Sequence, residues 1–144
     1  MARTLTVADA IITLRIPGLF NTPVTIQGFM TDNVYDAPTV ELTQTAMGVD
    51  GRLSAGTVLN PIDQTFYIQA DSESGDIFDT WWGISRTQVT TLRCFGETTL
   101  PALGTTYTSN NGALISWPPI PAGAKILQGR QALIRWESIV PNPL

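Results

Sequence analysis

Apolar and polar side chains alternate with a period of two along most of this chain, and that period is the repeat of a β-strand. The clearest example is the segment 39–46, in which Val40, Leu42 and Ala46 share one face. We expect this segment to be a strand that packs its apolar face on a core and leaves the other face in water. The residues of the polar face are Thr39, Glu41, Thr43 and Thr45.

Four further segments show the same alternation, at 10–16, 24–30, 66–70 and 131–139, and the segment 88–95 is rich in β-branched residues. Because β-branched side chains pack well on a pleated surface, we expect at least six or seven strands. The side chains predicted to face the core include Ile12, Leu14, Ile16, Val24, Ile26, Phe66, Ile68, Ala132, Ile134 and Trp136.

Turn residues separate these segments, and the most informative pair is Asp50-Gly51, which lies between two alternating runs. Both residues tolerate the positive φ that a tight hairpin turn requires. We therefore predict a long antiparallel hairpin over residues 39–59, with an unusually apolar tip near 49–51. The runs 110–112 (Asn-Asn-Gly) and 118–121 (Pro-Pro-Ile-Pro) are also predicted as turns.

The segment 72–84 has apolar residues spaced by one, three and four positions, which is the period of a short helix. Ser72 or Ser74 can cap its first turn, and Gly83 is a plausible end. Its two adjacent tryptophans could form a stacking platform for sugars or bases, but a stripe that must face the sheet favours core packing. The stripe consists of Ile77, Phe78, Trp81 and Trp82.

These patterns predict a mainly β fold, a β-sandwich or twisted barrel with one short α-helix, in a single domain spanning residues 1–144. Residues 1–8 are expected to form an N-terminal arm, and residues 141–144 a loose C-terminal tail. Charged residues make up 14% of the chain, against about 25% in soluble proteins, so we expect partners to cover part of the surface. With neither a long apolar run nor a signal peptide, we expect the chain to stay in a cytosol or in a particle assembled there.

Catalytic chemistry is not favoured by the sequence. It has no histidine, which removes the commonest general base and metal ligand. Glu73, Asp76 and Asp79 could form a metal or acid–base cluster, but their position opposite the apolar stripe favours a solvated helix face. Cys94, the single cysteine, is expected in the core rather than as a reactive thiol. We therefore expect no catalytic residue, metal or cofactor, and a small carboxylate-based enzyme is the least favoured function.

Arg130 and Arg135 lie on or beside the last alternating segment. They could contact phosphates, but a polar rim or an intersubunit salt bridge is the commoner use. The formal net charge of −4 argues against tight electrostatic binding of nucleic acid.

The order of these features resembles the tail tube proteins of contractile-tailed bacteriophages, and through them the tube protein of the type VI secretion system. The resemblance spans about residues 11–139 and rests on element order, on the hairpin tip Gly48-Val49-Asp50-Gly51-Arg52 and on the segment 69–79. It implies a β-sandwich or barrel with one helix, in which six copies form a ring and rings stack into a tube. The implied partners are further copies of the chain, sheath and baseplate proteins, and phage DNA as a non-specific cargo in the bore.

On that resemblance the chain is a structural virion protein of the tail, assembled in the host cytoplasm. A tube initiator or another ring protein at the baseplate end is the alternative, and a monomeric β-sandwich binding module is a further one. Thr39, Glu41, Thr43 and Thr45 are then expected to line the bore. The expected interface residues are Met47, Val49, Asp50, Arg52, Leu53, Trp82, Arg130 and Arg135.

Overall fold

The computed structural model describes residues 10–30 and 33–144 of the chain, so the expected N-terminal arm at 1–8 lies outside the described residues. Within them the fold is mainly β, as predicted, with ten strands and one helix. The two-residue period therefore identified the fold class correctly.

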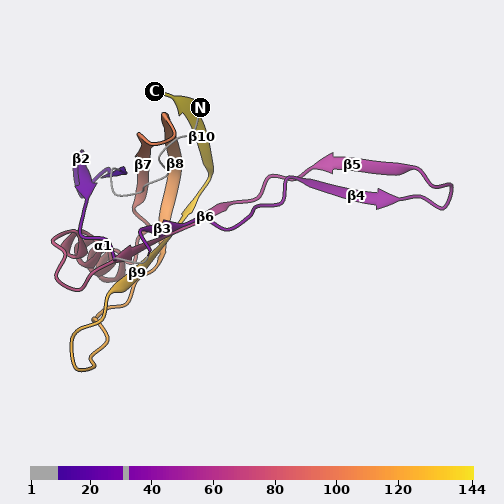
Figure 1. Cartoon of the computed structure of the whole chain (residues 1–144). Helices are drawn as coiled ribbons and strands as arrows, with labels where there is room; N and C mark the ends of the chain where they lie inside the picture. The colour runs from indigo at the N-terminus through magenta and orange to yellow at the C-terminus, as the bar shows by residue number, and fades with distance from the viewer. Residues whose placement is uncertain (1–9, 31–32) are drawn as a thin grey trace.

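Eight strands form one antiparallel sheet in the order β2-β1-β7-β8-β9-β6-β3, with β10 paired to β8 (Figure 1). The sheet curves around its core and stays open between β2 and β3, so the arrangement is sandwich-like rather than a closed barrel. The strands are β1 (Ile11–Ile16), β2 (Phe20–Ile26), β3 (Tyr35–Asp36), β6 (Ile62–Ile68), β7 (Arg93–Leu100), β8 (Thr105–Ser116), β9 (Arg130–Trp136) and β10 (Ser138–Pro143).

The core confirms the alternation in β1, β6 and β9. The buried side chains of the cluster are Ile12, Leu14, Ile16, Ile26, Phe66, Ile68, Phe78, Trp81, Cys94, Trp117, Ala132, Ile134 and Trp136. Cys94 is fully buried, as predicted, and this burial raises the pKa of its thiol to about 12. The expected strand at 88–95 begins only at Arg93, because the preceding helix continues to Gln88.

Helix α1 (Ser74–Gln88) is longer than the predicted segment 72–84, and Gly83 lies inside it. The helix ends at Val89, which adopts a left-handed conformation at φ 50°. Ser72 binds the first turn as expected, since the backbone N–H of Ser74 donates to Ser72 Oγ at 3.2 Å. Both serines also bind Gln27, the residue that follows β2. The backbone N–H of Gln27 donates to Ser74 Oγ at 2.7 Å, and Ser72 Oγ donates to the Gln27 carbonyl.

The run 110–112 is not a turn but a β-bulge inside β8. Cys94 pairs with Gly112 and Gly96 pairs with Ser109, so one residue of β7 faces two residues of β8. Gly112 is required there because a Cβ at this position would collide with the indole of Trp136.

The C-terminal segment 141–144 is not loose. Pro141, Asn142 and Pro143 pair with β8, and the N–H of Leu144 donates to the Gly104 carbonyl at 2.9 Å. Proline is compatible with this strand because β10 pairs only with β8 among the described strands, and an outer edge needs no donor.

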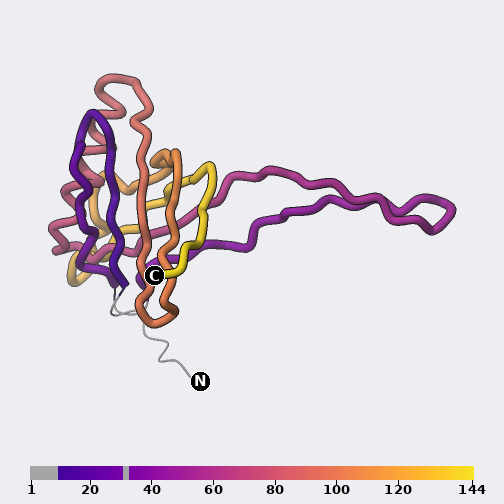
Figure 2. The backbone as a smooth tube through the Cα atoms, turned by 90° about the horizontal axis from the view of Figure 1, so that it is seen from above, coloured from indigo at the N-terminus to yellow at the C-terminus, as the bar shows by residue number. Residues whose placement is uncertain are grey.

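The predicted hairpin is present as β4 (Thr43–Met47) and β5 (Leu53–Thr57), which form a separate two-stranded sheet. It projects far from the body (Figures 1 and 2), and we call residues 39–60 the arm. The expectation that one face of this segment packs on the core is wrong, since every residue of β4 and β5 is exposed.

Candidate assembly surfaces

The tip of the arm is a well-defined three-residue turn. The N–H of Gly51 donates to the Gly48 carbonyl at 2.9 Å, and the N–H of Gly48 donates to the Arg52 carbonyl at 2.8 Å. Gly51 has φ +83°, which suits the left-handed last position of such a loop. The tip therefore lies where the sequence predicted it.

Apolar side chains surround this tip. Met47 and Leu53 are directly cross-strand partners, and Val49 is fully exposed at the end of the turn. Asp50 and Arg52 form an ion pair of 3.7 Å with both side chains in solvent, which contributes little to stability. All five residues expected at an interface from the hairpin thus lie together on a surface that no other part of residues 10–30 and 33–144 covers.

The polar residues Thr39, Glu41, Thr43 and Thr45 are also exposed on the arm. By the two-residue period they share a face with Met47 and Leu53, so the arm does not separate into one wet and one dry side. Their placement in a bore stays a prediction.

The face of the large sheet opposite α1 and the core is mainly polar, and none of the described elements covers it. Thr13, Glu97 and Thr108 lie in one cross-strand row on this face. Beside them Arg15 lies over the ring of Phe95, with its guanidinium carbon 4.9 Å from the centroid. A hollow of about 490 Å³ lies along these residues, and its two charged groups, Arg15 and Glu97, cancel. We call this surface the helix-free face.

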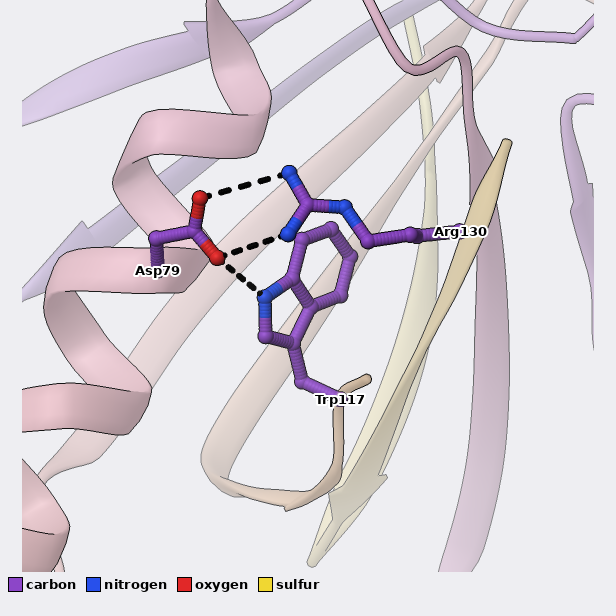
Figure 3. A network of polar contacts seen from close by, with 3 residues as sticks. All are labelled: Asp79, Trp117 and Arg130. Carbon is purple, nitrogen blue, oxygen red and sulfur yellow. Dashed lines mark hydrogen bonds and ion pairs between the residues drawn. The ribbon is translucent and has the colours of Figure 1, made fainter. Parts of the chain in front are cut away.

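Asp79, Trp117 and Arg130 form a polar cluster beneath the helix (Figure 3). Asp79 accepts hydrogen bonds from Arg130 Nη1 at 2.7 Å, from Arg130 Nη2 at 3.3 Å and from Trp117 Nε1 at 2.8 Å. The guanidinium also lies over the Trp117 ring, 4.4 Å from its centroid.

This cluster corrects one expectation and adds to another. Arg130 is buried and its partner belongs to the same chain, so it is not on the polar rim of an interface. Glu73 and Asp76 are exposed, as expected of a solvated helix face, while Asp79, with 41% of its side chain exposed, also binds Arg130. Within residues 10–30 and 33–144, no group of three or more His, Cys, Asp or Glu residues is arranged to hold a metal ion.

The other two expected interface residues lie near the surface. Arg135 binds Asp63 on the neighbouring strand β6 at 2.7 Å. This bond raises the pKa of the Arg135 guanidinium. Trp82 is half-buried, with Arg86 5.2 Å from its ring, whereas Trp81 is fully buried and donates to the Leu92 carbonyl. The core interpretation of Trp81 is thus confirmed.

The loop 117–129 between β8 and β9 exposes large aliphatic side chains and was missed by the sequence analysis as a surface. Its residues Ile120, Ile126 and Leu127 are exposed. The loop is ordered by its own bonds, since the N–H of Gln128 donates to the Ala122 carbonyl at 2.9 Å. The sequence could have indicated this surface, because the proline-rich turn contains aliphatic residues where a solvent-exposed loop is usually polar. Because Trp117 and Arg130 at its two ends both bind Asp79, we call it the clamped loop.

Among the described residues, no helix has the length and apolar character needed to cross a membrane.

The fold is shared with components of contractile injection systems. A chain of the anti-feeding prophage baseplate, in a six-fold symmetrised structure, superposes with a TM-score of 0.64 at 15% identity, over 99% of this chain and 98% of that one. A chain of the PVC sheath/tube terminator gives 0.61 at 12% identity, over 99% of both chains. A chain of the PVC sheath–tube complex gives 0.57 at 14% identity, over 92% of this chain and 88% of that one.

A family model described as tail fiber protein gp32 matches residues 3–140, and the chain therefore belongs to that family. The comparison with curated proteins found no significant match. The fold confirms the predicted resemblance to tube-like proteins of contractile tails. The family is named after a tail fiber protein rather than a tube protein. The protein is a structural component of a tail.

Proposed function

We propose that the chain is a ring subunit: six copies close into a ring, and rings stack coaxially as part of the inner tube of a tail. The observation that carries the proposal is the arm, a two-stranded sheet exposed on both faces. An isolated hairpin of this kind is marginally stable in water, so contacts beyond the chain are needed to hold it.

Two further features support ring formation. Among the described strands, β2, β3 and β10 each have one edge without a partner, and such an edge can pair with another chain at the positions that keep an N–H donor. Closing a ring removes such edges. The six-fold symmetrised baseplate to which this fold is similar supports six as the number of copies.

The helix-free face is the surface we assign to the bore. It is rich in hydroxyl groups and its hollow carries one charge of each sign, so it offers little attraction to phosphates. Such a wall suits a conduit from which DNA must leave quickly. The arm residues Thr39, Glu41, Thr43 and Thr45 would line this conduit only where the arm of one copy folds back over a ring.

A position at the baseplate end of the tube is the second candidate. It is supported by the similarity of the fold to a chain of the anti-feeding prophage baseplate. Partners in either position would include sheath or baseplate proteins.

Electron microscopy of the purified protein and of the intact particle tests the proposal. We expect ring-shaped particles with a central hole and six-fold class averages, with α1 on the outside. If no ring is present in either sample, the proposal is wrong.

A further inference from the structure

Large apolar side chains are concentrated on two exposed surfaces of the chain. Ten such side chains in the described residues have exposed fractions of 60% or more, and eight of them lie on the arm or on the clamped loop. Contiguous exposed apolar surface of this kind marks a contact site. The eight are Leu42, Met47, Val49, Leu53 and Leu59 on the arm, and Ile120, Ile126 and Leu127 on the loop.

The clamped loop is a preformed surface. Its two ends are joined through Asp79, and the bond from Gln128 to Ala122 closes its outer part. A surface ordered before binding loses less conformational entropy when a partner arrives. Beside it, residues 125–129 form a groove of about 790 Å³ with Met30 and the segment 69–71.

The two surfaces lie at opposite ends of the molecule. The arm projects from one side of the body, and the clamped loop lies at the other side, beyond β9 (Figures 1 and 2). Two unlike surfaces at opposite ends of one chain suit a head-to-tail contact between copies.

Their charges are complementary. The tip of the arm carries Asp50 and Arg52, and the groove is lined by Lys125 and Asp71, so each surface has one charge of each sign. A contact between them can place each charge beside one of opposite sign.

We propose that the tip of the arm of one copy docks on the clamped loop of another copy, with Met47, Val49 and Leu53 against the groove beside Ile126 and Leu127. The inference rests on the proposed ring subunit and names the surface that receives the arm. It makes the Asp79–Arg130 pair a positioning element for assembly.

Cross-linking between two variants that each carry one added, exposed cysteine tests the contact directly. Val49→Cys and Ile126→Cys are mixed in equal amounts and treated with a short bismaleimide. Cys94 is buried and reacts slowly. We expect a cross-linked dimer containing one copy of each variant. Val49→Cys mixed with Val89→Cys, a residue exposed elsewhere on the body, is the control and should not cross-link.

Light scattering on the same samples separates the two proposals. If the mixture assembles and the cross-link is absent, the arm docks elsewhere or on another protein, and the inference is overturned while the ring proposal stands. If the wild-type chain does not assemble at all, both proposals fail.

A second measurement uses aspartate substitutions at the same exposed positions. Val49→Asp and Ile126→Asp should each weaken self-association at least about tenfold, because each places a charge in an apolar contact. The double variant should self-associate no more weakly than either single variant, since both substitutions break the same contact. Additive losses would mean two separate contacts and would overturn the inference. Unchanged melting temperatures verify that the variants fold.

Discussion

Asp79 and Arg130, which are 51 positions apart in the sequence, form a two-bond ion pair that joins α1 to the start of β9. The two partners differ in exposure: the Arg130 side chain is 7% exposed and the Asp79 side chain 41%. Removing one partner therefore has a different consequence from removing the other.

We predict that Asp79→Ala destabilises the fold by about 3 kcal/mol, because it leaves a buried guanidinium without a counter-charge. Arg130→Met should cost clearly less, since the Asp79 carboxylate can be hydrated and the unbonded Arg130 Nε disappears. Urea unfolding of both variants measures the difference. Equal losses of unfolding free energy in the two variants would contradict the prediction that the unpaired buried arginine is the costlier partner.

The two aromatic residues of α1 with unlike burial provide a second prediction. Phe78 is fully buried, with its ring 4.9 Å from that of Trp117, so Phe78→Ala should lower the free energy of unfolding by about 4 kcal/mol. Trp82 is half-buried and should matter more to assembly than to the monomer. We expect Trp82→Ala to reduce assembly more than the melting temperature, and Phe78→Ala to do the reverse. Equal effects on both quantities would place Trp82 purely in the core.

Val89 ends α1 at φ 50°, a conformation that a β-branched residue adopts at a cost. Val89→Gly should therefore stabilise the protein by about 1 kcal/mol. Val89→Ala keeps a Cβ and should gain less. Chemical denaturation of the wild type and the two variants measures these differences in stability. A glycine variant less stable than the wild type would show that Val89 is not strained.

The buried thiol of Cys94 makes stability depend on pH in the alkaline range. Its pKa rises from about 9 to about 12 in the folded chain because burial disfavours the thiolate. The folded state thus holds this proton longer than the unfolded state, and the stabilisation present below pH 9 is lost as the pH rises toward 12. Cys94→Ala should show a shallower loss of stability between pH 9 and 11 than the wild type. Parallel curves would exclude this linkage.

The strands that form the core could be predicted because their alternation reports which side chains face it. Ile12, Leu14 and Phe66 lie where the period places them. The same period failed for Val40 and Leu42, because alternation identifies a strand but not whether another layer covers it. The Asp79–Arg130 pair could not be predicted either, since its partners meet only after the sheet has formed.

Two local signals were misread for identifiable physical reasons. Asn111 and Gly112 permit a turn, but they form a β-bulge, in which Asn111 has a positive φ of 48° and Gly112 leaves room for the indole of Trp136. Pro141 and Pro143 indicated a loose tail, yet an edge strand accepts proline where no donor is required.

The arm supplies the test of the assembly surface. Val49→Asp together with Leu53→Asp should leave the fold intact, because both side chains are exposed, and should sharply lower the assembled fraction. Val89→Asp is the matched control and should assemble like the wild type. If the arm variant assembles normally, the tip is only a solvent-exposed loop.

The molar mass of the wild-type protein, measured by light scattering over a range of concentrations and salt, tests the central claim most directly. The chain has a mass of 15.6 kDa. A ring subunit predicts species at six times this mass and at multiples of it as the concentration rises. A single species of 15.6 kDa at every concentration and salt would contradict the account.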